Sequence, residues 1–237
     1  KGIDLQGGSE FVVQLKPGVD DKGLPKPVSE VARQQAMAIL EKRLSPKGEK
    51  DLSLTPAGED RIIIQMPGVS PEEMDDVRNK IKQVAHLEFR IAHDNSAVEL
   101  ERIKTSGGVA IGYVKMDMRD PTKGEKELLV RNRPDLDGKY VSSAHASYDA
   151  EGWKVYLNLN SEGADLFDKV AAQNKFKRMA IIIDGQIISA PTLQTDHFGG
   201  TAVISGDFKE AEVRTLASVL ENPLENPMDI LGQSEVS

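Results

Sequence analysis

The chain has 237 residues, of which 39% are hydrophobic, so it can bury the core of one large domain or two small ones. Its formal net charge of −8 argues against a surface that binds nucleic acid or anionic lipid headgroups. The sequence lacks the run of about 20 apolar residues that a membrane helix requires, and it has no cysteine for disulfides, thiol catalysis or Cys-based zinc sites. Because it begins at Lys1 and carries no signal peptide, we expect an excised piece of a longer protein.

The chain opens with alternating strand and helix patterns. Apolar side chains alternate with polar ones from Phe11 to Leu15, which is typical of a half-buried strand. A helix is expected to begin near Ser29, because apolar residues then recur three and four positions apart as far as Leu44. Two further strands are predicted at residues 51–55 and 61–66.

A second helix begins at the sharpest local signal in the chain. Ser70 and Glu73 are spaced as a capping box, and Pro71 stands at the first helical position. Residues 86–92 then alternate as another strand. The order over residues 9–92 is therefore β-α-β-β-α-β, the ferredoxin-like arrangement of an antiparallel four-stranded sheet with both helices on one face. The expected fold class is α+β.

The remaining residues predict a less regular α+β region. Asp184-Gly185 between two apolar runs is a strong hairpin signal, because a type I′ turn needs positive φ. Ser161 is expected to cap one helix, and Asp207 with Glu210 to form a capping box for the last one. The other predicted elements are a helix at 96–105, strands at 112–118, 127–133, 139–148, 153–160 and 201–206, and a linker from residue 224 to the end.

Nothing in the sequence indicates an active site. It contains no phosphate-binding loop, no zinc-protease helix and no G-x-S-x-G nucleophile elbow. Metal sites need convergent ligands, so we interpret the scattered histidines as structural or surface residues. Trp153 is expected to pack in a core. We therefore predict no catalytic residue, no metal site and no cofactor. The histidines are His86, His93, His145 and His197.

Paired small residues stand beside four of the predicted strands. For three pairs, a turn or bulge that needs positive φ or a close backbone approach is a sufficient explanation. The fourth pair, at residues 7–8, follows Asp4, which that explanation does not account for. The first three pairs lie at residues 107–108, 184–185 and 199–200.

The opening stretch GIDLQGG, at residues 2–8, is one of five that resemble, in the same order, signatures of the SecD family of the bacterial protein-export machinery. Each signature is weak alone, but five in sequence cover both ends of the chain. Residues 93–140 match no signature. The other four stretches are RIIIQMPGVSPEE at 61–73, VAHLEFR at 84–90, MAIIIDGQIISAP at 179–191 and GGTAVISGDFKEAEVRTLASVLENPL at 199–224.

This resemblance implies the first large extracytoplasmic domain of a protein integral to the bacterial inner membrane, located at its periplasmic face. Such a domain consists of a ferredoxin-like base and a head. We expect residues 1–92 to be the base, 93–205 the head, 206–224 a final helix that could return to the base, and 225–237 a linker toward the next transmembrane helix. The membrane-proximal signature, expected to set the turn of the chain into its first strand, comprises Gly2, Asp4, Leu5, Gly7 and Gly8.

The resemblance also implies a function: assistance to proton-motive-force-dependent preprotein export through the Sec channel. The absence of catalytic motifs from the sequence leads us to expect no enzymatic activity. The implied partners are SecF, the SecYEG channel and an unfolded preprotein. Binding an unfolded chain requires a groove, an apolar patch or an open sheet edge. A core anchor is the alternative role for Phe198. The candidate chain-contact residues are Asp184, Gly185, Gln186, Phe198, Gly199 and Gly200.

Two other classes of function stay open at this point. Ferredoxin-like domains often bind small ligands or act as regulatory modules, and a convergent pocket would favour that class. An enzyme would require a pair of perturbed titratable groups in a cleft.

Overall fold

The computed structural model describes residues 8–19, 24–48, 51–70 and 72–236. The chain divides into two compact units. The base unit consists of the residues up to Ala85 together with those from Asn222 onward, and the head unit consists of residues 86–221. The base therefore ends before the expected boundary at residue 92, and the head continues past residue 205.

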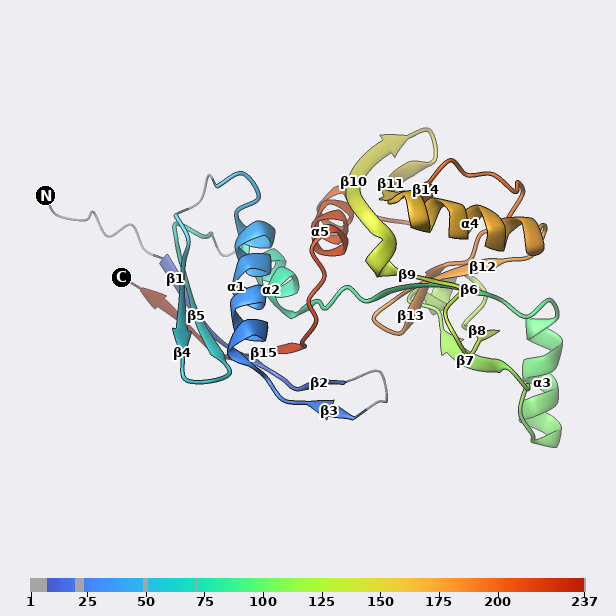
Figure 1. Ribbon diagram of the computed structural model, residues 1–237, viewed down its shortest axis with the longest axis horizontal. Helices are drawn as coiled ribbons and strands as arrows, with labels where there is room; N and C mark the ends of the chain where they lie inside the picture. The colour runs from blue at the N-terminus through green and yellow to red at the C-terminus, as the bar shows by residue number, and fades with distance from the viewer. Residues whose placement is uncertain (1–7, 20–23, 49–50, 71, 237) are drawn as a thin grey trace, which may run out of the picture. The chain divides into compact units, whose positions relative to one another are not determined.

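The base unit is an antiparallel four-stranded sheet with two helices on one face (Figure 1). Its strands lie in the spatial order β15-β1-β5-β4, which completes a ferredoxin-like β-α-β-β-α-β unit. The elements are β1 (Gly8–Leu15), α1 (Glu30–Leu44), β4 (Ser53–Ala57), β5 (Arg61–Pro67), α2 (Met74–Lys82) and β15 (Met228–Val236), with a small hairpin of β2 (Gly18–Val19) and β3 (Pro25–Lys26).

Local signals in the base form as predicted. Alternate residues of β1 are buried, and they share one core with the apolar faces of both helices. The Oγ of Ser29 accepts a hydrogen bond from the N–H of Ala32 at 3.1 Å, so Ser29 caps α1. Ser70 and Glu73 form the reciprocal hydrogen bonds of the expected capping box, in which each backbone N–H donates to the side chain of the other residue. The helix α2 begins later than predicted, at Met74, with Glu73 as its N-cap residue, and Pro71 lies outside the described residues.

The fourth strand of the base is not the one predicted. Residues 86–92 form β6 (Leu87–Ile91), which pairs with strands of the head. The base sheet is completed by β15, which pairs with β1 in the stretch expected to be a linker. Both predictions were wrong because β15 is an edge strand in which only Met228 is fully buried among the residues whose side chains are described, so it carries little period-two signal.

The head unit combines two sheets and a hairpin. One sheet has the order β13-β12-β6-β9, the other has the order β10-β11-β14, and β7 pairs with β8. Its elements after β6 are α3 (Ser96–Ser106), β7 (Tyr113–Asp117), η1 (Pro121–Lys123), β8 (Glu127–Arg131), β9 (Leu136–Asp137), η2 (Gly138–Tyr140), β10 (Val141–Asp149), β11 (Gly152–Leu159), α4 (Ser161–Gln173), β12 (Met179–Ile183), β13 (Gln186–Ser189), β14 (Thr201–Ser205) and α5 (Glu210–Glu221).

The cap of one helix in the head differs from the expectation, and the capping box expected of Asp207 and Glu210 at α5 stays a prediction. The side chain of Asn160, not Ser161, caps α4 by accepting from the N–H of Gly163 at 2.8 Å. At the start of α5, the N–H of Lys209 donates to the carboxylate of Glu212, whereas Glu210 pairs with Arg214 one turn later. The helix α5 contacts β10 and β11, so it belongs to the head and does not return to the base.

A fully buried arginine joins the parts of the base at which the chain leaves for the head and returns from it. The guanidinium of Arg43, on α1, donates to backbone carbonyl oxygens of two separate segments. Three acceptors lie at the end of α2 and just beyond it, and the fourth is Asn222, where the chain returns. The N–H of Leu224 also donates to the carbonyl of Val84 at 2.9 Å. The four acceptors are Lys80 (2.8 Å), Gln83 (2.5 Å), Val84 (3.3 Å) and Asn222 (2.7 Å).

Replacing this side chain should destabilise the base selectively. We expect Arg43→Ala to lower the free energy of unfolding of the base by about 3 kcal/mol or more, because several buried carbonyl oxygens lose their donor. Hydrogen exchange of amides in α1 and α2 measures this loss separately from the head. The exposed neighbour gives a matched control, Lys42→Ala, which should change the same quantity by less than about 0.5 kcal/mol. Equal protection in wild type and Arg43→Ala would contradict the role assigned to Arg43.

Candidate functional site

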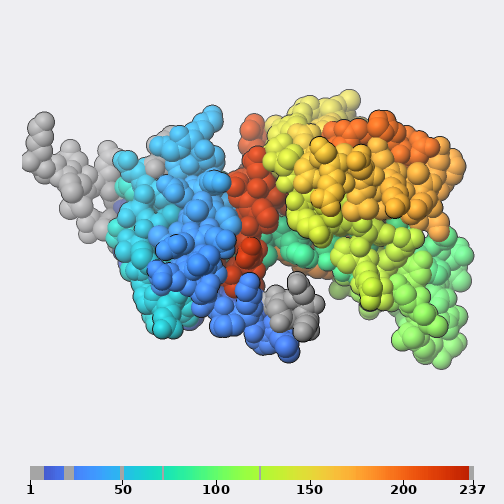
Figure 2. All heavy atoms as spheres, viewed as in Figure 1, coloured from blue at the N-terminus to red at the C-terminus, as the bar shows by residue number. Residues whose placement is uncertain are grey.

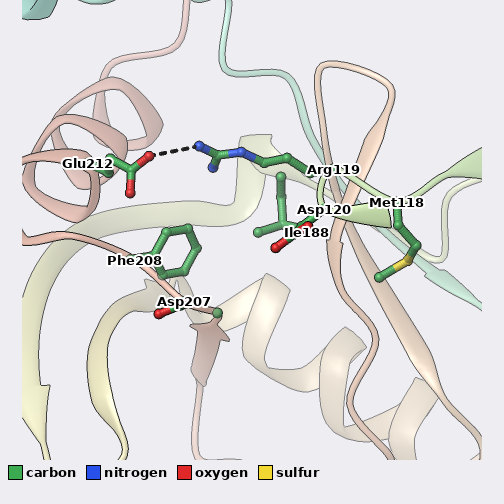
Figure 3. Close-up of a pocket in the computed structure, with 8 residues that line it drawn as sticks. Met118, Arg119, Asp120, Ile188, Asp207, Phe208 and Glu212 are labelled. Carbon is green, nitrogen blue, oxygen red and sulfur yellow. Dashed lines mark ion pairs between the residues drawn. The ribbon is translucent and has the colours of Figure 1, made fainter. Parts of the chain in front are cut away.

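The head unit contains an open pocket of about 250 Å³ (Figure 3). Its walls are formed by the stretch that follows β7, the strand β13, the loop between β14 and α5, and the first turn of α5. Its lining combines apolar and charged side chains. The apolar lining is Met118, Ile188 and Phe208, the charged lining is Arg119, Asp120, Asp207 and Glu212, and Gly206 completes it.

Backbone pairing positions this pocket. The N–H of Arg119 donates to the carbonyl of Ile187 at 2.8 Å, and Met118 forms a parallel bridge with the same residue. These contacts fasten the stretch after β7 to the outer edge of β13. Ile188 is the extra residue where the register between β12 and β13 shifts, and such a bulge re-aims a side chain. The bulge accounts for the presence of Ile188 in the pocket lining.

Arg119 organises the charges at the pocket. Its guanidinium lies 3.5 Å from the carboxylate of Glu212 and 5.8 Å from the centre of the Phe208 ring (Figure 3). The side chains of Arg119 and Glu212 are 41% and 45% exposed, so solvent screens the pair and its contribution to stability is below about 1 kcal/mol. Because the pair is screened, a ligand can separate Arg119 from Glu212 at small cost. Asp120, beside it, accepts a hydrogen bond from the N–H of Thr122.

The ionisable groups that line this pocket are one guanidinium, of Arg119, and three carboxylates. An apolar floor with a charged rim can accommodate an apolar side chain while the rim meets polar backbone groups.

The first half of the predicted chain-contact region forms the β12–β13 turn. Asp184 and Gly185 have φ of +50° and +81°, as the type I′ turn requires. The carboxylate of Asp184 accepts from the N–H of His86 at 2.8 Å, and the N–H of Asp184 donates to the carbonyl of His86. Asp184 is thus engaged in holding the first residue of the head, whereas Gly185 and Gln186 are exposed.

The second half of that region lies in the loop before β14. Phe198 is half-buried, its ring centre lies 4.9 Å from that of Phe167, and its N–H donates to Asp168 at 2.8 Å. Gly200 is buried, and a Cβ there would approach Ala164 to 3.1 Å, while Gly199 is exposed. This packing favours the core-anchor role for Phe198. Contact of either half with a polypeptide stays a prediction.

Of the membrane-proximal signature, only Gly8 lies within the described residues. Gly2, Asp4, Leu5 and Gly7 lie outside them. Gly8 begins β1 and pairs with Pro67 of β5. A Cβ at Gly8 would lie 3.0 Å from the Cα of Pro67, so any other residue here would make a tight contact with the backbone of β5.

A charged cluster lies at the start of β6. The carboxylate of Glu88, a buried residue, hydrogen-bonds with the ring of His86 and accepts hydrogen bonds from the guanidinium of Arg90. Burial acts to raise the pKa of Glu88, but the hydrogen bonds from His86 and Arg90 outweigh it and hold that pKa below 4.5. The hydrogen bond to Glu88 raises the pKa of His86 above 6.5, against a smaller opposing effect of burial.

The other histidines have separate surroundings. His93 packs edge-on against Tyr113, His145 stacks on Tyr156, and His197 pairs with Asp168. Within the described part of the chain, no three His, Asp or Glu side chains are grouped so as to hold a metal ion. No helix among the described residues is long and apolar enough to cross a membrane.

The pocket was not predicted from the sequence. Arg119 is distant along the chain from Phe208 and Glu212, which it meets at the pocket, and none of the three has a distinctive local pattern. The one available signal was SGDF at 205–208, a polar break with a single aromatic residue between a strand and a helix.

The fold defines a ferredoxin-like domain that carries an α+β head inserted before its last strand. Residues 33–94 match the family model described as "Protein translocase subunit SecDF, P1 domain, N-terminal", and residues 114–224 match "SecDF, P1 head subdomain". The chain belongs to the SecD/SecDF family of protein translocase subunits, in which it corresponds to the P1 domain.

Two curated relatives illustrate the similarity. Protein translocase subunit SecD of Syntrophobacter fumaroxidans is 30% identical over all of this chain and 45% of the relative. Protein translocase subunit SecDF of Thermus thermophilus is 29% identical over 93% of this chain and 29% of the relative. The chain thus spans less than half the length of these relatives.

Solved structures agree with this assignment. A crystal structure of SecDF in a super-membrane-facing form superposes with a TM-score of 0.73 at 27% identity, over 99% of this chain and 31% of that one. A structure of SecDF described as a membrane component that enhances protein export gives a TM-score of 0.68 at 26% identity, over 94% of this chain and 98% of that one. The mixed α+β class with base and head subdomains is therefore confirmed.

The His86–Glu88 pair predicts a specific titration. We expect the NMR titration midpoint of His86 to lie above 6.5 and to move back toward 6.5 in Glu88→Gln. Since the folded pKa of His86 is raised, its contribution to stability is complete below 6.5 and is lost as pH rises through the folded value. The contribution of Glu88 is present above 4.5 and is lost as pH falls through its lowered folded value.

The control is Glu99→Gln, which removes a carboxylate that pairs with Arg102 instead. This variant should leave the His86 midpoint in place. An unchanged midpoint in Glu88→Gln would mean that Glu88 does not set the protonation of His86.

Proposed function

We propose that this chain is the extracytoplasmic domain of a protein translocase subunit that assists preprotein export through the Sec channel. In this proposal the domain lies at the periplasmic face of the bacterial inner membrane, in a membrane-embedded parent protein. It works with SecF and the SecYEG channel, and its head contacts the emerging unfolded chain. In this proposal the proton motive force drives the assistance to export, and it acts through the membrane part of the parent protein.

The observation that carries the proposal is that the likeness to P1 domains extends over both units. A ferredoxin-like base alone would support many functions, because that fold hosts unrelated activities. An inserted head with the same place in the fold is a far more specific feature. The solved relative described as enhancing protein export covers nearly this whole chain, which supports an export role for this domain.

The pocket beside β13 supports contact with polypeptide. Apolar side chains at its floor suit an apolar residue of an extended chain, and the rim at Arg119 and Glu212 suits polar backbone groups. A translocating chain must be released as well as held, so weak binding is required. An open pocket with a screened ion pair meets that requirement better than an enclosed cavity.

Coupling to the membrane part requires that the head be connected to the base in a defined way. Head and base are joined by two chain crossings, at residues 85–86 and 221–222. Both crossings begin in base segments that accept hydrogen bonds from Arg43. This arrangement suits the transmission of force through two linked segments.

The alternative of a small-ligand or regulatory module on the ferredoxin-like unit receives no support from the pocket, which lies in the head. The absence of enzymatic activity likewise stays a prediction.

Site-specific crosslinking in cells tests the proposal. A SecD-depleted bacterium would express a SecD whose corresponding domain is replaced by this chain, with a photoreactive amino acid at Gln186 or Ile188. We expect restored export and crosslinks from both positions to a preprotein arrested in the channel. Gln34, exposed on α1 of the base, is the control position and should give no crosslink.

Two results would contradict parts of this proposal. If the chimera fails to restore export although it is folded and inserted, the export role is wrong. If export is restored but no head position crosslinks to the preprotein, contact between head and chain is wrong and a docking role replaces it.

A further inference from the structure

The segment between α3 and β7 exposes aliphatic side chains that the fold does not bury. Val109 is 77% exposed and Ile111 is 92% exposed. Single exposed aliphatic residues are common on protein surfaces, but here two stand within three positions in the short sequence GGVAIG. We call Val109, Ala110 and Ile111 the aliphatic tip.

A tight turn displays the tip. The N–H of Tyr113 donates to the carbonyl of Ala110 at 3.1 Å, which closes a four-residue turn with Ile111 at its first central position. Gly112, at the second central position, has a φ of +81°, a conformation that glycine adopts without strain. Ile111 therefore stands at the corner of the turn and faces solvent.

Both ends of the segment are fastened to the head. Lys104 on α3 and Lys115 on β7 both pair with the carboxylate of Glu127 on β8, at 2.6 Å and 3.0 Å. The N–H of Asn132 donates to the carbonyl of Gly112 at 3.0 Å. The tip is thus held on a scaffold, and a preorganised apolar surface loses less conformational entropy on binding than a flexible one.

The tip is also part of a projection of the head. Figure 2 shows the green atoms of α3 and of the segment after it standing out from the body of the head. One family model ends at residue 94 and the other begins at residue 114, so neither includes the tip.

We propose that the aliphatic tip binds apolar stretches of an unfolded polypeptide. This inference rests on the proposed function and assigns it a contact surface besides the pocket. The tip is convex, and a small ligand needs a concave site, whereas an unfolded chain can wrap around a projection. Aliphatic side chains without a directional polar partner suit contacts that must accept many sequences.

The charges around the tip argue against a lipid surface as the partner. Loops that enter a membrane interface combine aromatic residues with lysine or arginine. The tip has no aromatic residue, and the two lysines that flank the segment are paired with Glu127. The chain as a whole carries a net charge of −8, which anionic lipid would repel.

A binding assay with paired peptides and paired variants tests this inference. The probes are a soluble, fluorescently labelled Gly/Ser peptide with a short leucine block and the same peptide with serine in place of each leucine. Val109→Ser combined with Ile111→Ser removes the tip. Val31→Ser combined with Leu231→Ser removes two aliphatic side chains of the same sizes from the base, where these side chains are 62% and 52% exposed.

We expect wild type to bind the leucine peptide in preference to the serine peptide, as measured by fluorescence anisotropy. The tip variant should bind it about fivefold more weakly or worse, because two aliphatic side chains lose part of their burial. The base variant should bind as wild type does. Circular dichroism should give the same spectrum for all three, because every substitution is at an exposed position.

Three outcomes would overturn the inference. Equal affinity of wild type and tip variant would show that the tip is not the contact. Equal affinity for the two peptides would show that apolar stretches are not recognised. Self-association of wild type that the tip variant abolishes, without peptide binding, would make the tip an interface between copies of this chain. If any of these occurs while the chimera still crosslinks to preprotein at Gln186, the proposed function stands without the tip.

Discussion

The buried guanidinium of Arg43 holds together the two segments through which the head is inserted into the base. A buried cation is costly unless its donors are satisfied, and here carbonyl oxygens accept from it. Several of them belong to the C-terminal end of α2, where carbonyl groups lack helical partners and the helix dipole favours positive charge. The same side chain reaches Asn222, so the departing and returning segments lie together.

This constraint explains how a ferredoxin-like unit tolerates an insertion of more than half the chain before its last strand. A domain tolerates an insertion well when the two ends of the inserted unit lie close together, because the insertion then costs little more than closing a long loop. In the base, the bond from Leu224 to Val84 joins those ends directly. The strand β15 can then take its place beside β1 as though α2 led straight into it. The head folds around its own core and carries the surfaces to which we assign contact with polypeptide.

Much of the candidate site was beyond prediction for a related reason. The β12–β13 turn was predictable, because Asp184-Gly185 between two apolar runs is a local signal for a turn with positive φ. The hydrogen bond between His86 and Asp184 was not predictable, because the two residues are distant along the chain and no sequence motif links them. The pocket depends on a bulge at Ile188 and on Arg119 reaching α5, which are properties of packing rather than of periodicity.

The sequence by itself determined the local elements of this protein: the alternation of β1, the caps at Ser29 and Ser70, and the hairpin turn before β13. These depend on neighbours a few residues apart, whose chemistry can be read directly. Only the tertiary structure decided which sheet each strand joins, and so where the base ends and the head begins. Alternation shows that a strand buries one face, but it does not specify the neighbour. The pairing of β6 with β12, and of β15 with β1, follows from long-range packing around separate cores.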